Sequence, residues 1–448
     1  MSGCEVSARD HTNLIEKGNV MRDFAPALGQ TRNASQRGLL ACLVGATAFL
    51  FNAQANAARY FGEVRTHVIQ EAGCNASSPV QIPGTLNLFL NRQLLTAAGQ
   101  VAGISGPNDC SGGDAANEKN GGIYNRWALT VNRLDWDSNK LVLLKTVLDT
   151  SIDPSTKRSR AFITGGPTRG GIIQSAYDPD VVLYRGIYFV SFECVLANGD
   201  RLGVHGTSSC VGRYDPNRQE IDLSHTQVVV SGVPIGDRFQ AAAVPELLVF
   251  EDRLFIYWSS LTNNHGVFER IAIRGAELEL LNGDLQVKGS YGHQTYSADQ
   301  GTTVEVWAPD PNESTANTAI DLRAVWSNGK SIIAMAGVGG GGCAGPGDKT
   351  PGCFRLMIAK AESPLGDQIF NRAEKVDDDL LPTNPQEYTR PLRGGDNTFW
   401  FVGHYFRPPM NGFSEKRPIP AGNFWSKDKK ASELVIFPIE DRSIWPSE

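Results

Sequence analysis

Short runs of β-branched and aromatic residues, separated by tight turns, recur along the chain. Val181–Tyr184 and Ile187–Phe192 flank a turn at Gly186. Two such runs joined by a turn of this kind are typical of a β-hairpin. The same pattern recurs around three later turns, at Asp252, Gly329 and, in a looser form, Asn397. Long amphipathic helical patterns are scarce, so the chain is predicted to be all-β.

The spacing of these turns predicts the architecture. With a further turn at Gly121, subtraction gives separations of 65, 66, 77 and 68 residues to Gly186, Asp252, Gly329 and Asn397. A repeat of this length fits a four-stranded sheet with its loops, and five of them need about 340 residues. We therefore predict a five-bladed β-propeller. A β-sandwich with coincidental spacing is the alternative.

Two further features of the pattern support blades. Ile123–Leu134 and Leu141–Leu148 flank the polar turn Asp137–Asn139 and predict a hairpin. Phe61–Gln70 reads as a strand, and the apolar run Leu434–Ile439 is expected to pair with it and close the propeller.

The N-terminus has the pattern of a targeting segment. Arg32 and Arg37 precede the apolar run Leu39–Phe51, and Ala55–Ala57 provides a small-x-small cleavage signal. The apolar run is too short to span a bilayer. We predict an N-terminal extension with a signal peptide in residues 1–57 and a single β-propeller domain in residues 58–448. The mature protein is expected to be periplasmic or secreted, without a transmembrane segment, and monomeric.

Charge and cysteine content narrow the class of protein. The chain has 42 Lys and Arg against 48 Asp and Glu, with no basic stripe, which argues against nucleic acid as a partner. An even number of cysteines after the signal segment favours disulfides over zinc, because no Cys-x-x-Cys spacing occurs. The expected local pairs are Cys74–Cys110, Cys194–Cys210 and Cys343–Cys353.

An acidic residue opens each of four units. These residues are Asp178, Glu246, Asp321 and Glu387. In a propeller the innermost strands converge on a central channel, so the four side chains are expected to face one another. Clustered carboxyls can divide into a protonated acid and an ionised base, which is the pair that glycoside hydrolysis needs. For each residue taken alone, the alternative is a solvated turn position.

Several motifs resemble the arabinanase-type five-bladed propellers of glycoside hydrolase family 43. The resemblance covers residues 176–402 and rests on Asp178-Pro179, on Val244–Leu247 and on the positions of Asp321 and Glu387. It implies that Asp178 is the general base, that Asp321 tunes the acid and orients substrate, and that Glu387 is the general acid. The expected Gly-Pro after the acid is Tyr388-Thr389 in this chain. Asp180 and Glu305 are competing carboxylates, and the acid is either Glu387 or Glu305.

Four further residues are candidates for binding substrate: Glu246, Tyr177, Trp258 and His404. Trp258 offers an aromatic face to a sugar, although Trp at such a strand position is commonly part of the core. His404 is a candidate for lining the channel, with a structural histidine as the alternative. No metal site and no cofactor is expected, although a structural cation in the channel would suit the architecture.

The sequence therefore predicts an exported glycoside hydrolase with a carbohydrate substrate. It would act on a plant- or envelope-type polysaccharide or oligosaccharide of arabinose- or xylose-like sugars, by an inverting two-carboxylate mechanism. The alternative is a non-catalytic propeller that binds glycan or protein at the cell envelope.

Overall fold

The computed structural model describes the chain in segments, all within the compact unit Asn56–Glu448. They are residues 66–69, 76–94, 96–97, 100–101, 126–135, 138, 140–235, 238–264, 267–289, 296–300, 302–304, 319–339, 354–365, 374–375, 387–388, 390–394, 398–406 and 432–447. The predicted signal peptide and the boundary after residue 57 lie outside these segments and stay predictions. None of the helices within them is long and apolar enough to cross a membrane.

Antiparallel ladders group the strands into five blades. The first contains β2 (Ala76–Gln81), β3 (Asn87–Leu94), β6 (Arg126–Asp135) and β7 (Lys140–Leu148). The second contains β8 (Ile173–Tyr184), β9 (Ile187–Leu196), β10 (His205–Asp215) and β11 (Glu220–Ile235). The third contains β12 (Arg238–Phe250), β13 (Arg253–Asn264), β14 (Val267–Leu281) and β15 (Asp284–Val287).

The last two blades follow the same order. The fourth contains β18 (Ala319–Ser327), β19 (Ile332–Gly339), β20 (Phe354–Ala361) and β21 (Glu374–Lys375). The fifth contains β22 (Glu387–Tyr388), β23 (Leu392–Arg393), β24 (Phe399–Phe406), β25 (Ser432–Pro438) and β1 (Thr66–Ile69). Short elements in the connections between these strands are β4 (Thr96–Ala97), β5 (Gln100–Val101), α2 (Gly199–Leu202), β16 (Tyr296–Ser297) and β17 (Thr302–Val304), and η3 (Arg442–Ile444) follows β25.

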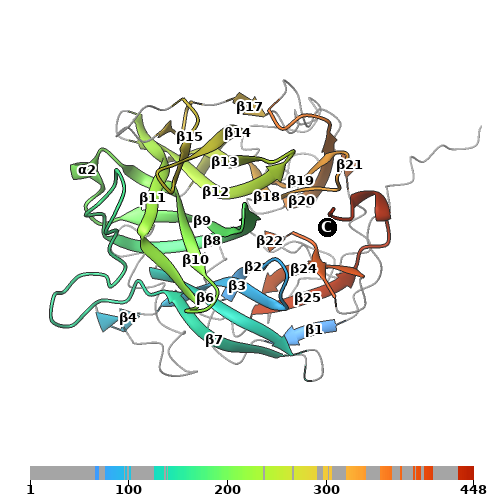
Figure 1. Cartoon of the computed structure of the whole chain (residues 1–448), viewed down its shortest axis with the longest axis horizontal. Helices are drawn as coiled ribbons and strands as arrows, with labels where there is room; N and C mark the ends of the chain where they lie inside the picture. The colour runs from blue at the N-terminus through green and yellow to red at the C-terminus, as the bar shows by residue number, and fades with distance from the viewer. Residues whose placement is uncertain are drawn as a thin grey trace, which may run out of the picture. The chain divides into compact units, whose positions relative to one another are not determined.

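The innermost strands of the five blades form a closed ring. β2 contacts β8, β8 contacts β12, β12 contacts β18, β18 contacts β22, and β22 contacts β2. In Figure 1 these strands surround the middle of the fold. This closure confirms the five-bladed β-propeller. Neighbouring blades also join at their edges, through three residue pairs between β11 and β12 and through one parallel pair between β1 and β7.

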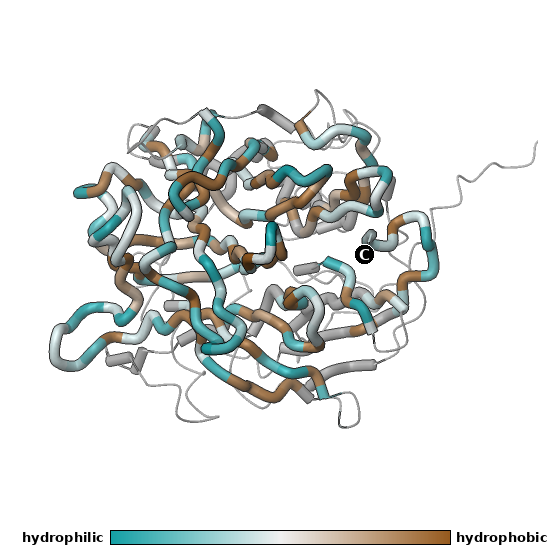
Figure 2. Tube along the Cα trace, in the orientation of Figure 1, coloured by the Kyte–Doolittle hydropathy of each residue, from teal (hydrophilic) through white to brown (hydrophobic). Residues whose placement is uncertain are grey.

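The hydrophobic core lies between neighbouring sheets, as expected when both faces of each blade are covered. Figure 2 shows hydrophobic residues along the strands and hydrophilic residues in the turns between them. Four clusters fill the blade interfaces, represented by Phe89 with Phe192, Phe189 with Trp258, Tyr257 with Val325, and Leu90 with Trp400. Burying each large apolar side chain contributes about 1.5–3 kcal/mol, so packing between the blades is a large part of the fold's stability.

The two ends of the propeller meet in one blade. β1 pairs antiparallel with β25, with Thr66 opposite Ile436 and Ile69 opposite Glu433. This confirms the predicted closing strand. Because a late strand and an early strand share a sheet, the first and last blades cannot separate without breaking that ladder.

The first blade differs from the sequence-based expectation. β6 and β7 form the predicted hairpin, but they are the outer half of the blade. The inner hairpin is β2–β3, whose turn contains Gly84 with a φ of 75°. Gly121, predicted as the first turn of the repeat, lies outside the described residues. The inner turn at Gly84 lies 102 residues before Gly186, by subtraction, so the predicted separation of 65 residues is not the distance between the inner turns of the first two blades.

One predicted disulfide falls in the described residues. Cys194 and Cys210 are bonded, and they join β9 to β10 inside the second blade. This confirms that local pair. Cys74, Cys110, Cys343 and Cys353 lie outside the described residues, so their pairing stays a prediction.

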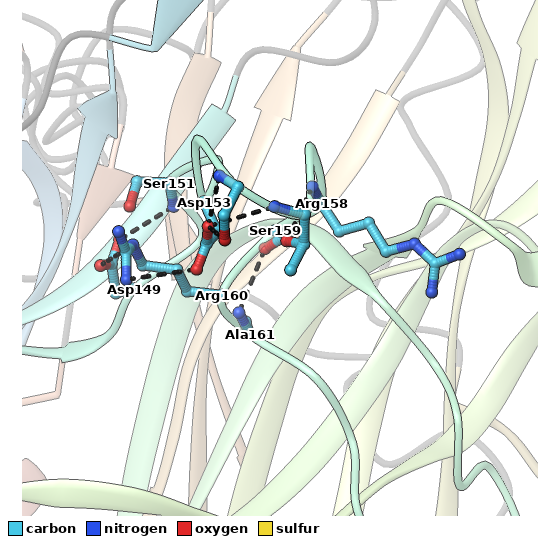
Figure 3. Close-up of polar contacts among 9 residues, drawn as sticks. Asp149, Ser151, Asp153, Arg158, Ser159, Arg160 and Ala161 are labelled. Carbon is cyan, nitrogen blue, oxygen red and sulfur yellow. Dashed lines mark hydrogen bonds and ion pairs between the residues drawn. The ribbon is translucent and has the colours of Figure 1, made fainter.

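The connector between the first and second blades is closed by its own polar contacts (Figure 3). Asp149 Oδ1 accepts from the Ser151 amide at 2.8 Å, and Asp153 Oδ1 accepts from the Ser155 amide at 2.8 Å. Arg160 lies between the two carboxylates. Its Nε is 3.7 Å from Asp149 Oδ2, and its Nη1 is 3.8 Å from Asp153 Oδ2. These contacts fix the path by which the chain returns from the outer strand β7 to the inner strand β8.

Candidate functional site

The inner strands of the second and third blades share an unusual local structure. Asp178 in β8 and Val244 in β12 have φ values of 49° and 47°. A bulge interrupts each ladder at that point, and in each strand a proline and then an acidic residue follow: Asp180 in β8 and Glu246 in β12. A positive φ at a residue other than glycine costs about 1–3 kcal/mol and persists only when the surroundings hold it.

Side chains of β9 hold the bulge of the next blade. Glu193 Oε1 accepts from the Val244 amide at 2.8 Å, and Ser191 Oγ donates to the Pro245 carbonyl at 2.7 Å. Glu193 and Ser191 are buried. The strained backbone of β12 is thus fixed by the second blade. Buried hydrogen bonds of this kind are costly to leave unmade, which keeps the two blades in register.

The acidic residues after the prolines also bind the next blade. Asp180 Oδ2 accepts from the Leu247 amide at 2.6 Å. The Glu246 carboxyl accepts from the Val325 amide in β18. Each acid therefore bridges its own inner strand to the following one. This structural role distinguishes Asp180 and Glu246 from a carboxylate that faces open solvent.

Arg390 completes a central acid cluster, which we define as Asp178, Asp180, Glu246 and Arg390. Its Nη2 donates to Asp180 Oδ2 and to the Leu247 carbonyl, and its Nε lies 4.0 Å from Glu246 Oε2. The side chain of Asp180 is 1% exposed and that of Arg390 is 17% exposed. The cluster is therefore largely removed from water, and its charges interact strongly.

Burial sets the protonation of this cluster. It raises the pKa of Asp180, against the Arg390 charge and the Leu247 hydrogen bond that favour the anion. Burial, together with the negative charges of Asp180 and Asp178, raises the pKa of Glu246 well above its ordinary value, against the charge of Arg390. Arg390 is closer to Asp180 than to Glu246, so it favours the anion of Asp180 more strongly than the anion of Glu246.

We expect the parent protein to lose stability as pH rises, and we expect Glu246→Gln not to show this loss. The folded-state pKa of Glu246 is raised, so its contribution to stability is fully present below the ordinary pKa of 4.5 and is lost as pH rises through the folded pKa. Gln is neutral at every pH, so it makes no pH-dependent contribution to the free energy of unfolding. The measurement is the free energy of unfolding in urea from about pH 5 to pH 8. Parallel curves for the two proteins would show that Glu246 does not titrate in this way.

The predicted catalytic residues all lie on innermost strands. Asp178 is half-buried at the bulge of β8. Asp321 lies in β18 opposite Gly337, and Glu387 lies in β22 opposite His404 of β24. For Asp321, Glu387 and His404 the structure describes the backbone only, so whether their side chains meet that of Asp178 stays a prediction. Glu305, the competing acid, lies outside the described residues.

Two aromatic candidates have defined surroundings. Tyr177 is half-buried next to Asp178, and its hydroxyl lies 3.3 Å from Thr207 Oγ1. Trp258 is 0% exposed, and its Nε1 donates to the Ala298 carbonyl at 3.0 Å. The indole of Trp258 has no exposed face for a sugar in this structure, and its position fits the core alternative. Tyr177 therefore stays a candidate for contact with substrate, whereas Trp258 belongs to the core.

Arg390 was not predicted from the sequence. It follows Glu387 in a segment without a clear hydrophobic pattern. The signal that could have indicated it is physical: two acids placed at equivalent positions after a bulge and proline need a cation when they are buried. Among the described residues no three His, Cys, Asp or Glu side chains are grouped so as to hold a metal ion.

Searches with protein-family models and against curated protein sequences found no match. The structure is similar to an exo-1,5-α-L-arabinanase from a bovine ruminal metagenomic library, at 13% identity, 83% and 96% coverage of this chain and that chain, and a TM-score of 0.44. It is also similar to the native arabinanase Arb43A of Bacillus subtilis, at 12% identity, 84% coverage of this chain, 99% coverage of that chain and a TM-score of 0.41. A third similar structure is the α-L-arabinanase of Cellvibrio cellulosa complexed with arabinohexaose, at 12% identity, 83% coverage of this chain, 95% coverage of that chain and a TM-score of 0.43. These values are low, so the fold rests on the strand pairing described above, and nothing about activity follows from the similarity.

Proposed function

We propose that the protein is an inverting glycoside hydrolase. The observation that supports it best is the equivalence of Asp178 and Asp321. Each lies eight residues before the glycine of its inner hairpin turn, by subtraction from Gly186 and Gly329. Equivalent positions on the innermost strands of a propeller lie at the same level around its axis. Strand β22, which carries Glu387, belongs to the same ring.

The proposed reaction divides the work between two carboxyls. Asp178 takes a proton from a water molecule as that water attacks the anomeric carbon. Glu387 gives its proton to the glycosidic oxygen as the bond from carbon to that oxygen breaks. Asp321 raises the pKa of Glu387 by its negative charge and orients the sugar. Inversion needs room for the water, so the carboxyls of Asp178 and Glu387 should stand roughly 6.5–9.5 Å apart.

The local chemistry of Asp178 suits a base. It is half-buried, whereas Asp180 is engaged by the Leu247 amide and by Arg390. Of the two aspartates around Pro179, Asp178 is thus the one with more access to solvent. Residues in strained backbone conformations cluster at active sites, and the positive φ of Asp178 fits that tendency.

The choice of sugar rests on the sequence motifs that resemble family 43 enzymes. Within this proposal the substrates are glycans of arabinose- or xylose-like sugars, with Tyr177, Glu246 and His404 as residues near the substrate. The disulfide between Cys194 and Cys210 is compatible with an oxidising compartment, and export to the periplasm or medium is part of the proposal.

The test is an assay of the purified protein on arabino- and xylo-furanosides and -pyranosides, from aryl glycosides to polysaccharides. We expect release of reducing sugar, and proton NMR of the first product should show the anomer opposite to that of the substrate. A product with retained configuration would contradict the assignment of Asp178 as base and Glu387 as acid. Binding of a glycan in calorimetry without any hydrolysis would favour the non-catalytic propeller instead.

A further inference from the structure

Arg390 joins three blades through one side chain. Its backbone belongs to the fifth blade, between β22 and β23, which both pair with β24. Its guanidinium donates to Asp180 Oδ2 in the second blade and to the Leu247 carbonyl in the third. A guanidinium has fixed, planar donors, so it can hold two acceptors in one geometry in a way that a lysine cannot.

The contact lies close to both proposed catalytic carboxyls along the chain. Asp178 precedes Asp180 by two residues, and Glu387 precedes Arg390 by three, by subtraction. Few residues separate the contact from the proposed base and acid, and Pro179 has a fixed φ, so there is little slack between the contact and the base. The ion pair of Asp180 and Arg390 therefore constrains how far apart the two catalytic backbones can be.

We propose that Arg390 is a positioning residue, which sets the separation of Glu387 and Asp178 by fixing the fifth blade to the second and third. The inference rests on the proposed function, since it assigns Arg390 a role in that reaction. Arg390 need not touch the sugar for this role. A misplacement of about 1 Å in a reacting group can lower the rate of a reaction about 10²-fold.

The charge of Arg390 gives the role a second signature. It opposes the increase in pKa of both Asp180 and Glu246. Removing a cation from a group of carboxyls makes each of them harder to ionise. The low-pH limb of the rate profile, where the base must lose its proton, should then move to higher pH. A residue that only stabilises the fold would leave that limb in place.

The experiment compares Arg390→Met and Arg390→Lys with the parent. We expect Arg390→Met to lower kcat about 10²-fold with a smaller change in KM, and to shift the low-pH limb upward. Arg390→Lys should keep the limb, because the charge remains, and recover part of kcat. It also serves as the folded variant if Arg390→Met does not fold.

Arg185→Met is the matched control. Arg185 Nη2 lies 2.9 Å from Asp252 Oδ2, so this pair also joins the second and third blades, but its side chains are exposed. The same substitution at that site should leave kcat, KM and the pH profile unchanged. A loss of kcat in Arg185→Met as large as in Arg390→Met would overturn the inference, because any break between blades would then have the same effect.

A measurement without substrate separates this inference from the proposed function. Unfolding of Asp180→Asn, Arg390→Met and the double variant forms a double-mutant cycle. We expect the double variant to lose less stability than the two single losses added together. Additive losses would overturn the contact on which the inference depends.

If the parent and Arg390→Met hydrolyse a substrate equally fast, the positioning role of Arg390 is overturned while the proposed function stands. If the cycle is non-additive and the parent hydrolyses nothing, the proposed function fails and Arg390 is a structural tether only.

Discussion

Asp178→Asn is expected to lower turnover about 10²–10⁴-fold, the range that a general base contributes. The amide cannot take a proton from the attacking water, whereas its shape is that of the carboxylate. Folding should be retained, because Asn adopts a positive φ as readily as Asp and the side chain is half-buried. The measurement is kcat and KM on a substrate that the parent hydrolyses, with the thermal midpoint as the check on folding.

Asp252→Asn supplies the control for this substitution. Asp252 has a φ of 55° in the corresponding inner hairpin of the third blade, but it lies in an exposed turn. The two substitutions thus replace Asp by Asn in the same region of backbone φ, but Asp252 lies away from the central acid cluster. Turnover should equal that of the parent. If Asp178→Asn is as active as the parent on the same substrate, Asp178 is not the base.

The blades were predictable where hairpins carry clear turns. Around Gly186, Asp252 and Gly329, two apolar runs meet at a turn that accepts a positive φ, and these three turns are the inner hairpins of consecutive blades. The pairing of β1 with β25 was also predictable, because Phe61–Gln70 reads as a strand and the apolar run Leu434–Ile439 can close a blade with it. These features depend on local pattern, which a sequence carries directly.

The first blade was predicted incorrectly for a local reason. Residues 95–125 separate β3 from β6, and they are rich in Gly and Asn. β2 is short and contains a bulge between Ser77 and Val80, so its alternation of apolar and polar positions is broken. The hairpin of β6 and β7 was therefore predictable, whereas the inner hairpin of β2 and β3 was not, and Gly121 was the wrong first turn of the repeat.

The site was only partly predictable, because a bulge changes which side chains face the interior. The bulge of β8 places one extra residue between Tyr177 and Asp180. A change of one residue in register exchanges the two faces of a strand, so the sequence indicates both Asp178 and Asp180 without telling which is buried. Arg390 contacts Asp180 across 210 residues of chain, and no local pattern reports such a contact.

Glu387→Gln is expected to separate the acid from the base by its dependence on the leaving group. A sugar alkoxide leaves only when it is protonated, so hydrolysis of an oligosaccharide should fall about 10²–10⁴-fold. An activated aryl glycoside releases a phenolate that needs little help from an acid, and its hydrolysis should fall far less. Asp178→Asn should slow both substrates alike, because every attack needs the water to be activated.

The same pair of substrates also decides between the two candidate acids. Glu305→Gln is the parallel variant, and with Glu387 as the acid it should hydrolyse both substrates at the rate of the parent. If Glu305→Gln shows the dependence on the leaving group and Glu387→Gln does not, the acid is Glu305 and β22 has no role in the reaction. A large and equal loss on both substrates in Glu387→Gln would instead indicate that Glu387 holds the sugar or the fold. Glu387 lies in β22, which belongs to the ring of innermost strands and pairs with β24 at His404. This backbone position is the reason to expect that Glu387, and not Glu305, is the acid.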